Sequence, residues 1–178
     1  MNKHSRFTSN ARKLAAVVLA ISGAGSAMAA TATATSTSVV ITPIAISKTA
    51  DLAFGNIGAG ATAGTVTVSP NGSRGVTGGT IAAGGTSTAA QFNVTGQAGL
   101  TYSISLSGTS PTLTSGANTM AFTAISDTTA SAFTTGTVAT GTLAGGAQTI
   151  YIGGALTVGA NQVAGTYTGS INVAVDYN

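Results

Sequence analysis

A period-two alternation of apolar and small polar residues recurs along this chain and constrains its fold more than any other feature. Between Leu100 and Leu106 every second residue is apolar, and the residues between them are threonine or serine. The segment from Tyr167 to Tyr177 alternates in a similar way. Such alternation is typical of an antiparallel strand with one face buried and the other in water. Further alternating runs carry Val66 and Val68, Phe92 and Val94, Met120 and Phe122, and Ile150, Ile152, Leu156 and Val158.

Turn-forming residues separate the alternating runs, and no apolar stripe of helical period follows residue 29. The breaks include Asn71-Gly72, Gly84-Gly85 and Gly145-Gly146, which are dipeptides that favour turns. Gly153-Gly154 falls inside a run and predicts a bulge or a sharp bend there. About eight or nine short strands joined by turns predict an all-β fold, an immunoglobulin-like antiparallel β-sandwich.

The first 29 residues have the composition of a secretory signal peptide. Basic residues crowd the first 13 positions, and an apolar run then extends from Leu14 to Ile21. The small residues of Ala27-Met28-Ala29 suit a signal peptidase, and the apolar run is shorter than the roughly 20 residues that span a bilayer. We therefore expect a cleaved N-terminal signal helix over residues 1–29, with cleavage between Ala29 and Ala30. The alternative is an uncleaved N-terminal anchor.

Cleavage would leave residues 30–178, a mature chain with little charge. Its basic residues are Lys48 and Arg74 and its acidic residues are three aspartates, so its net charge is −1. No basic patch remains to bind phosphates, so we expect no nucleic-acid partner. Residues 30–38 contain only Ala, Thr and Ser, which predicts a flexible arm. Residues 39–178 are expected to form a single β-sandwich domain without a stable membrane span.

The mature chain holds no histidine and no cysteine, which excludes most catalytic chemistry. A Ser–His–Asp triad and a zinc site both need residues that are absent. A Ser–Lys dyad would depend on Lys48, which we interpret as a solvated charge on an edge strand. Asp51, Asp127 and Asp176 are too isolated in the sequence for a calcium loop. We therefore expect no catalytic residue, no metal and no cofactor, and hence a protein that is not an enzyme.

Several short motifs occur in an order that resembles one bacterial family. They are Asp51-Leu-Ala-Phe-Gly55, Val66-Thr-Val-Ser-Pro70, Phe92-Asn-Val-Thr-Gly96, Tyr102-Ser-Ile104, Ile152-Gly-Gly-Ala-Leu156, Gly165-Thr-Tyr-Thr-Gly169 and Val173-Ala-Val-Asp-Tyr-Asn178. In this order they resemble the secreted family called domain of unknown function 4402, over about residues 39–178. That family has no assigned activity. A looser similarity of pattern links the chain to fimbrial, pilin-like subunits, and Phe54 of the first motif is expected to anchor the core.

The similarity to fimbrial subunits implies a structural or adhesive cell-surface protein that assembles by strand addition. The donor segment in that interpretation carries Val40, Ile44 and Ile46 on one face. The acceptor is the C-terminal strand with Ile171, Val173, Val175 and Tyr177. The implied partners are further copies of the chain, a periplasmic chaperone and an outer-membrane assembly machinery. The protein would cross the inner membrane, pass through the periplasm and reach the cell surface, a fimbrium or the medium.

The alternative is a self-complete secreted module, a monomeric β-sandwich that binds an unassigned ligand. In that case the β-rich segment from Val39 to Ile46 is a first strand that pairs within its own chain. Pro43 places this strand at a sheet edge or beside a bulge, because proline removes one donor from the ladder. Both interpretations stay open at the level of the sequence.

Overall fold

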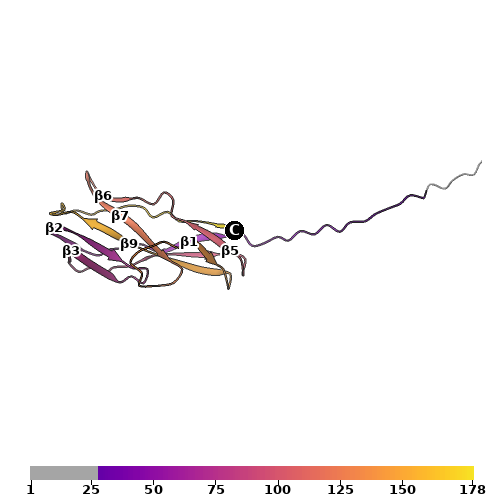
Figure 1. Ribbon diagram of the computed structural model, residues 1–178, viewed down its shortest axis with the longest axis horizontal. Coiled ribbons are helices and arrows are strands. Elements are labelled where there is room, and N and C mark those ends of the chain that lie inside the picture. Colours follow the sequence, from indigo (N-terminus) through magenta and orange to yellow (C-terminus); the bar gives the residue numbers. More distant parts are fainter. Residues whose placement is uncertain (1–27) are drawn as a thin grey trace, which may run out of the picture. The chain divides into compact units, whose positions relative to one another are not determined.

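The computed structural model describes residues 28–178. Within that range the regular secondary structure consists of β-strands, and no helix is present (Figure 1). The ten strands are β1 (Ala45–Ala50), β2 (Ile57–Val68), β3 (Arg74–Ala82), β4 (Ala90–Thr95), β5 (Thr101–Ser105), β6 (Thr112–Ser115), β7 (Asn118–Asp127), β8 (Thr140–Thr142), β9 (Ala147–Val158) and β10 (Ala174–Tyr177). All ten belong to one compact unit, Val39–Asn178. The predicted all-β fold is therefore confirmed, whereas residues 1–27 of the expected signal peptide lie outside the described residues.

The larger sheet has seven strands and is organised around β9, which is paired on both edges. Along one edge, β9 pairs with β4 through Ala147–Ile152 and then with β2 through Gly154–Val158. Along the other edge, residues 151–156 pair with β7. Strands β1, β3 and β6 continue the sheet outward beside β4, β2 and β7, and every pair is antiparallel.

The smaller sheet forms the second layer, with the strand order β10-β5-β8. Buried residues of β5 pack with buried residues of β4 and β9 in one apolar cluster, so the two sheets face each other. This second cluster consists of Ala90, Val94, Tyr102, Ile104, Leu143, Ile150 and Ile152. Two antiparallel sheets with a shared core make the β-sandwich that the alternation predicts.

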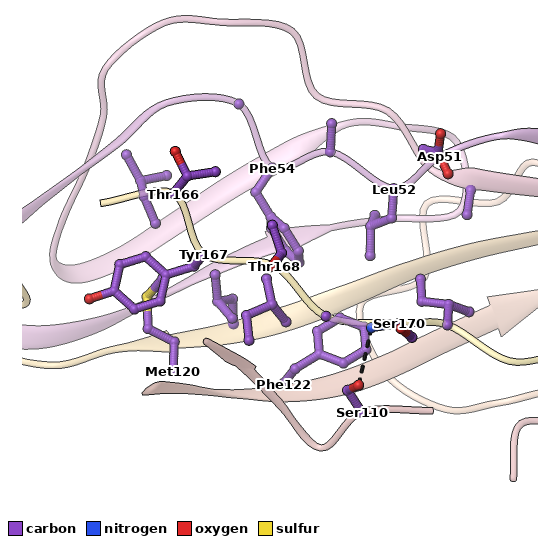
Figure 2. A pocket seen from close by; sticks show the side chains of 18 of the residues that line it. Asp51, Leu52, Phe54, Ser110, Met120, Phe122, Thr166, Tyr167, Thr168 and Ser170 are labelled. Carbon is purple, nitrogen blue, oxygen red and sulfur yellow. Dashed lines mark hydrogen bonds between the residues drawn. The ribbon is translucent and has the colours of Figure 1, made fainter. Parts of the chain in front are cut away.

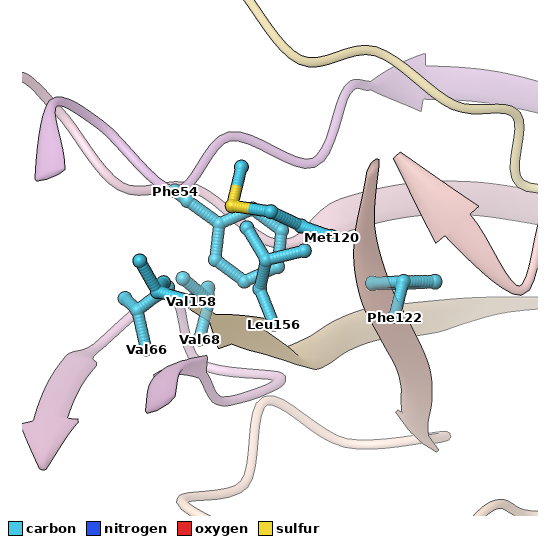
Figure 3. Packing of buried hydrophobic residues seen from close by; sticks show 7 residues of the cluster. All are labelled: Phe54, Val66, Val68, Met120, Phe122, Leu156 and Val158. Atoms are coloured by element: carbon cyan, nitrogen blue, oxygen red, sulfur yellow. The ribbon is translucent and has the colours of Figure 1, made fainter. Parts of the chain in front are cut away.

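A further apolar cluster, the first cluster, fills the other part of the core (Figure 3). It consists of Phe54, Val66, Val68, Met120, Phe122, Leu156 and Val158. The rings of Phe54 and Phe122 meet edge to face, with their centroids 6.2 Å apart. Such a pair stabilises a core beyond the apolar area that it buries. The predictions that Phe54 anchors the core and that the alternating residues of β2, β7 and β9 share buried faces are confirmed.

Gly153-Gly154 does not form a bulge, which was one of the two predicted features, since the pairing of β9 with β7 continues through it without a register shift. The two glycines instead allow close approach of other groups. A Cβ at Gly154 would overlap the ring of Phe122, and a Cβ at Gly153 would overlap the carbonyl of Val68. The pair thus marks the point where β9 changes partner from β4 to β2.

The first strand begins later than the sequence predicts. The apolar run that starts at Val39 predicts a strand over residues 39–46, but β1 spans Ala45–Ala50. Pro43 lacks an N–H group, and the strand starts only after it. Val39, Val40 and Ile41 are exposed instead. Ile44 and Ile46 pack against the second cluster, and Ile46 pairs with Val94 of the same chain.

Tyr177 fixes the point where the chain enters the domain. Its hydroxyl accepts a hydrogen bond from the N–H of Gln97 at 2.6 Å and donates one to the carbonyl of Thr42 at 2.8 Å. The Thr42 N–H in turn donates to Oε1 of Gln97. The penultimate residue of the chain therefore holds the segment that leads into β1, and we call this contact the Tyr177 clasp.

Replacing Gly154 with alanine is expected to destabilise the domain. The added methyl group meets the Phe122 ring, and overpacking of this kind costs about 1–3 kcal/mol. Gly145→Ala is the matched control, because nothing lies within 4 Å of a Cβ at that position. Urea denaturation of both variants measures the difference. Equal stability of the two would show that the Phe122 ring does not occupy this space.

The variant Tyr177→Phe is expected to lose about 0.5–1.5 kcal/mol of stability for each hydrogen bond removed. It should also speed amide hydrogen exchange at Thr42 and Gln97. Tyr151→Phe is the control, because the described residues offer its hydroxyl no hydrogen-bond partner. Unchanged exchange at both amides in the Tyr177 variant would contradict the clasp.

Candidate functional site

A groove of about 870 Å³ opens in the side of the domain, between two stretches of chain that are far apart in the sequence (Figure 2). One wall is the segment from Lys48 to Ile57, which includes the end of β1. The other wall is the segment from Gly165 to Asn172, which leads into β10. Figure 2 shows the side chains of Phe54 and Phe122 directed into the space between these walls.

The floor of the groove is apolar. Its residues come from β4, β7, β9 and the turn before β2, namely Phe54, Ala90, Phe92, Met120, Phe122 and Leu156. Four of these six belong to the first cluster. The groove therefore lies over the hydrophobic core, and an apolar side chain placed in it would extend that core.

The C-terminal wall is hydrogen-bonded on one edge. Thr168 exchanges two backbone hydrogen bonds with Thr114, at 2.8 and 3.0 Å, and the carbonyl of Ser170 accepts one from the N–H of Ser110. In an extended chain, successive residues direct their backbone groups to opposite edges. Gly169 and Ile171 therefore direct theirs toward the groove, and no group in residues 28–178 bonds to them.

The opposite wall is fixed from behind. Ala53 exchanges two backbone hydrogen bonds with Thr88, on the edge away from the groove. The Arg74 guanidinium donates to the carbonyls of Phe54 at 2.8 Å and Gly84 at 3.1 Å. Gly55 makes the turn with a φ of +70°, where a Cβ would overlap the Arg74 side chain. This wall holds its position without anything in the groove.

The groove is closed at one end. Beyond Asn172 the gap between the first and last strands is filled, because Ile44 and Ile46 pack against the second cluster together with Val173 and Val175. The Tyr177 clasp lies further along the same gap. The groove thus runs beside Gly165–Asn172 and stops where the chain's own first strand closes against its last.

Little charge borders the groove. Lys48 and Asp51 are the charged residues that line it, and they pair with each other at 2.5 Å with both side chains exposed. The groups whose pKa departs from its ordinary value lie outside the groove. Burial raises the pKa of Tyr102, and polar neighbours of the Asp127 carboxyl, the Ser131 side chain foremost, lower the pKa of Asp127. A cleft with an apolar floor, little net charge and an unpaired backbone edge is suited to an extended polypeptide.

The residues predicted as donor and acceptor do not gather at one site in the structure. Of the donor residues, Ile44 and Ile46 contact the chain's own core, while Val40 is 93% exposed. Of the acceptor residues, Ile171 lines the groove, whereas Val173 leads into β10, and Val175 and Tyr177 pair with β5. Ala29 and Ala30, at the expected cleavage site, are exposed and belong to no strand.

Sequence reasoning missed the wall from Leu52 to Ile57 and the role of Arg74. The motif Asp51-Leu-Ala-Phe-Gly55 could have indicated this wall, because the motif combines two apolar residues of one parity with a turn glycine.

In residues 28–178, no set of three His, Cys, Asp or Glu residues gathers as a metal site. The same range contains no helix that is long and apolar enough to cross a membrane.

Comparison with known proteins identifies a family. No curated protein and no solved structure matches the chain. The model of one family does match, over residues 44–177, which include all ten strands, both groove walls and the Tyr177 side of the clasp. The chain therefore belongs to the family described as "Domain of unknown function (DUF4402)".

Proposed function

We propose that this protein is a secreted structural or adhesive subunit of the cell surface, similar to pilins, that assembles by strand addition. The observation that carries the proposal is the unpaired edge of Gly169 and Ile171 beside an apolar floor. An extended segment of another polypeptide fits there as an additional strand. Its backbone would bond to this edge, and its alternate side chains would enter the groove.

The energetics favour filling the groove. Each backbone hydrogen bond contributes about 0.5–1.5 kcal/mol net, and apolar side chains laid on the floor add about 25 cal/mol per Å² of buried apolar surface. An open strand edge beside apolar surface is also an aggregation hazard until something covers it. A subunit of this kind needs a periplasmic chaperone to cover the groove before assembly, and an outer-membrane machinery to exchange the chaperone for the next subunit.

A second candidate function is the self-complete secreted module. The observation that favours it is that β1 pairs with β4 of its own chain and that the Tyr177 clasp holds Thr42. In this case the groove binds a ligand from outside, and the protein stays monomeric. The two candidate functions differ in whether the backbone groups of Gly169 and Ile171 gain hydrogen-bond partners when the protein is concentrated.

Hydrogen exchange on the mature protein, residues 30–178, tests the proposal. We expect size-exclusion chromatography and electron microscopy to show concentration-dependent polymers. In the polymers, the amides of Gly169 and Ile171 should exchange at least about tenfold more slowly than in dilute monomer, because they gain hydrogen-bond partners. The amides of Thr168 and Ser170 are the internal control, since both are bonded within the chain. A monomer at every concentration would instead support the self-complete module.

The proposed compartment has its own test. Mass spectrometry of protein from the periplasm or medium should find a mature N-terminus at Ala30. A chain that starts at Met1 would contradict cleavage and support the uncleaved anchor.

A further inference from the structure

Resting on the proposed function, we infer that the occupant of the groove is the arm of a second copy of this chain. The inserted segment is residues 34–41. It runs antiparallel to the wall from Gly165 to Asn172, with the odd-numbered side chains Thr35, Thr37, Val39 and Ile41 directed to the floor.

Residues 28–41, called the arm from here on, have the composition of a strand but pair with no other segment of the described chain. Residues 28–41 form no strand, and Val39 and Val40 are 86% and 93% exposed. Its odd-numbered residues from 31 to 41 are all threonine, valine or isoleucine, which are β-branched and favour strands. It carries no charge, which suits a groove whose only bordering charges pair with each other.

The arm of the same copy is poorly suited to this groove. Thr42 is held by Gln97 and Tyr177, and the chain then continues through β1 into the groove wall, which begins at Lys48. To enter its own groove, the arm would have to reverse direction just before Thr42. Of the residue types that tight reversals favour, residues 28–41 contain only serine, at positions 36 and 38, and the residues directly before Thr42 are Val39, Val40 and Ile41. An arm from a second copy needs no reversal.

The sizes of the side chains in residues 34–41 indicate which face of this segment is directed to the floor of the groove. The even-numbered residues of the segment are Ala34, Ser36, Ser38 and Val40, and three of the four are too small to fill a groove of about 870 Å³. The odd-numbered face carries two large apolar residues and two threonine methyl groups. In an antiparallel pair opposite residues share a face, so the odd donor residues must oppose odd wall residues. Thr37 then lies opposite Gly169, which has no side chain to obstruct it.

The direction follows from the closed end of the groove. The folded domain of the donor copy begins at Thr42, directly after the inserted segment. Antiparallel insertion places Ile41 beside Gly165, at the end away from the Tyr177 clasp. Parallel insertion would place the donor domain beside Asn172, where Ile44, Val173 and the clasp close the gap. Eight residues in strand geometry span about 27 Å, and the wall from Gly165 to Asn172 also has eight residues.

Two aspartate variants test the inward face. Val39→Asp is expected to raise the concentration at which polymers form by more than about tenfold, because it would bury a charge on the floor. Val40→Asp is the matched control, with its side chain on the outward face, and should assemble nearly as the unchanged protein does. Both side chains are exposed in the monomer, so neither change should affect folding. The opposite ranking of the two variants would overturn the inference.

Paired cysteines test the register, because the natural chain contains no cysteine. In this register Ser36 lies opposite Ser170 on the outward face, in a pair whose Cβ atoms are about 4.5–5.5 Å apart. The double variant Ser36→Cys/Ser170→Cys should therefore form a ladder of covalent multimers on oxidation. Thr35→Cys/Ser170→Cys, with the first cysteine turned to the opposite face, should not.

A mixture of the two single variants, Ser36→Cys and Ser170→Cys, separates the sources of the arm. A covalent heterodimer that links Cys at position 36 of one variant to Cys at position 170 of the other, and that neither variant forms alone, confirms that the arm comes from another copy. A covalent link within monomers of the double variant would overturn this assignment. Polymers that form without the Ser36–Ser170 link would overturn the register but leave strand addition intact, whereas the absence of polymers would contradict the proposed function itself.

Discussion

Strand β9 is the element on which the rest of the structure depends, because one of its edges is paired along almost its full length and the other is paired over residues 151–156. It joins β4, β2 and β7 into one sheet and contributes Ile150, Ile152 and Leu156 to the core. The absence of a side chain at Gly154 lets the Phe122 ring reach the space beside β9, and that ring in turn meets Phe54. The floor of the groove is thus a consequence of one small residue in the central strand.

The groove lies beside a segment of the chain that is hydrogen-bonded on only one of its two edges. The segment from Gly165 to Asn172 bonds through alternate residues to the stretch before and within β6, and its other edge faces the groove. The wall opposite is tied back by Thr88 and Arg74, so it cannot move in to close the gap. The free groups of this edge belong to the backbone of Gly169 and Ile171, and no group in residues 28–178 bonds to them. What this edge requires is an extended backbone from elsewhere, or water.

Much of the fold could be predicted from the sequence, because parity determines which residues of a strand are buried. The alternation placed Val66, Phe122 and Ile150 on buried faces correctly. It failed at the first strand, where the apolar run from Val39 to Ile41 has strand composition but precedes Pro43, and pairing starts only beyond the proline. Local composition does not report whether a partner strand is within reach.

The groove itself was not predictable in the same way. Its walls are irregular segments, and their position depends on contacts across the fold. The carbonyl of Phe54 is held by Arg74, which is 20 residues later, and Thr168 is held by Thr114. The motif from Asp51 to Gly55 indicates a strand end with a turn, but only the assembled sheet shows that this turn borders an open edge. Of the residues that the C-terminal alternation singles out, Ile171 lines the groove, whereas Val175 and Tyr177 pair with β5.

Strand addition would build one kind of assembly or another depending on where the arm leaves the domain relative to the groove. The arm leaves the domain at Thr42, beside the clasp and the closed end of the groove. A donor that inserts antiparallel has its own domain at the other end of the groove. Donor and acceptor surfaces are then different parts of each copy, so the contact is heterologous and repeats head to tail from copy to copy. Such a contact builds an open fibre unless the rotation between successive copies closes it into a ring, and the hydroxyl of Tyr177 fixes where each arm begins.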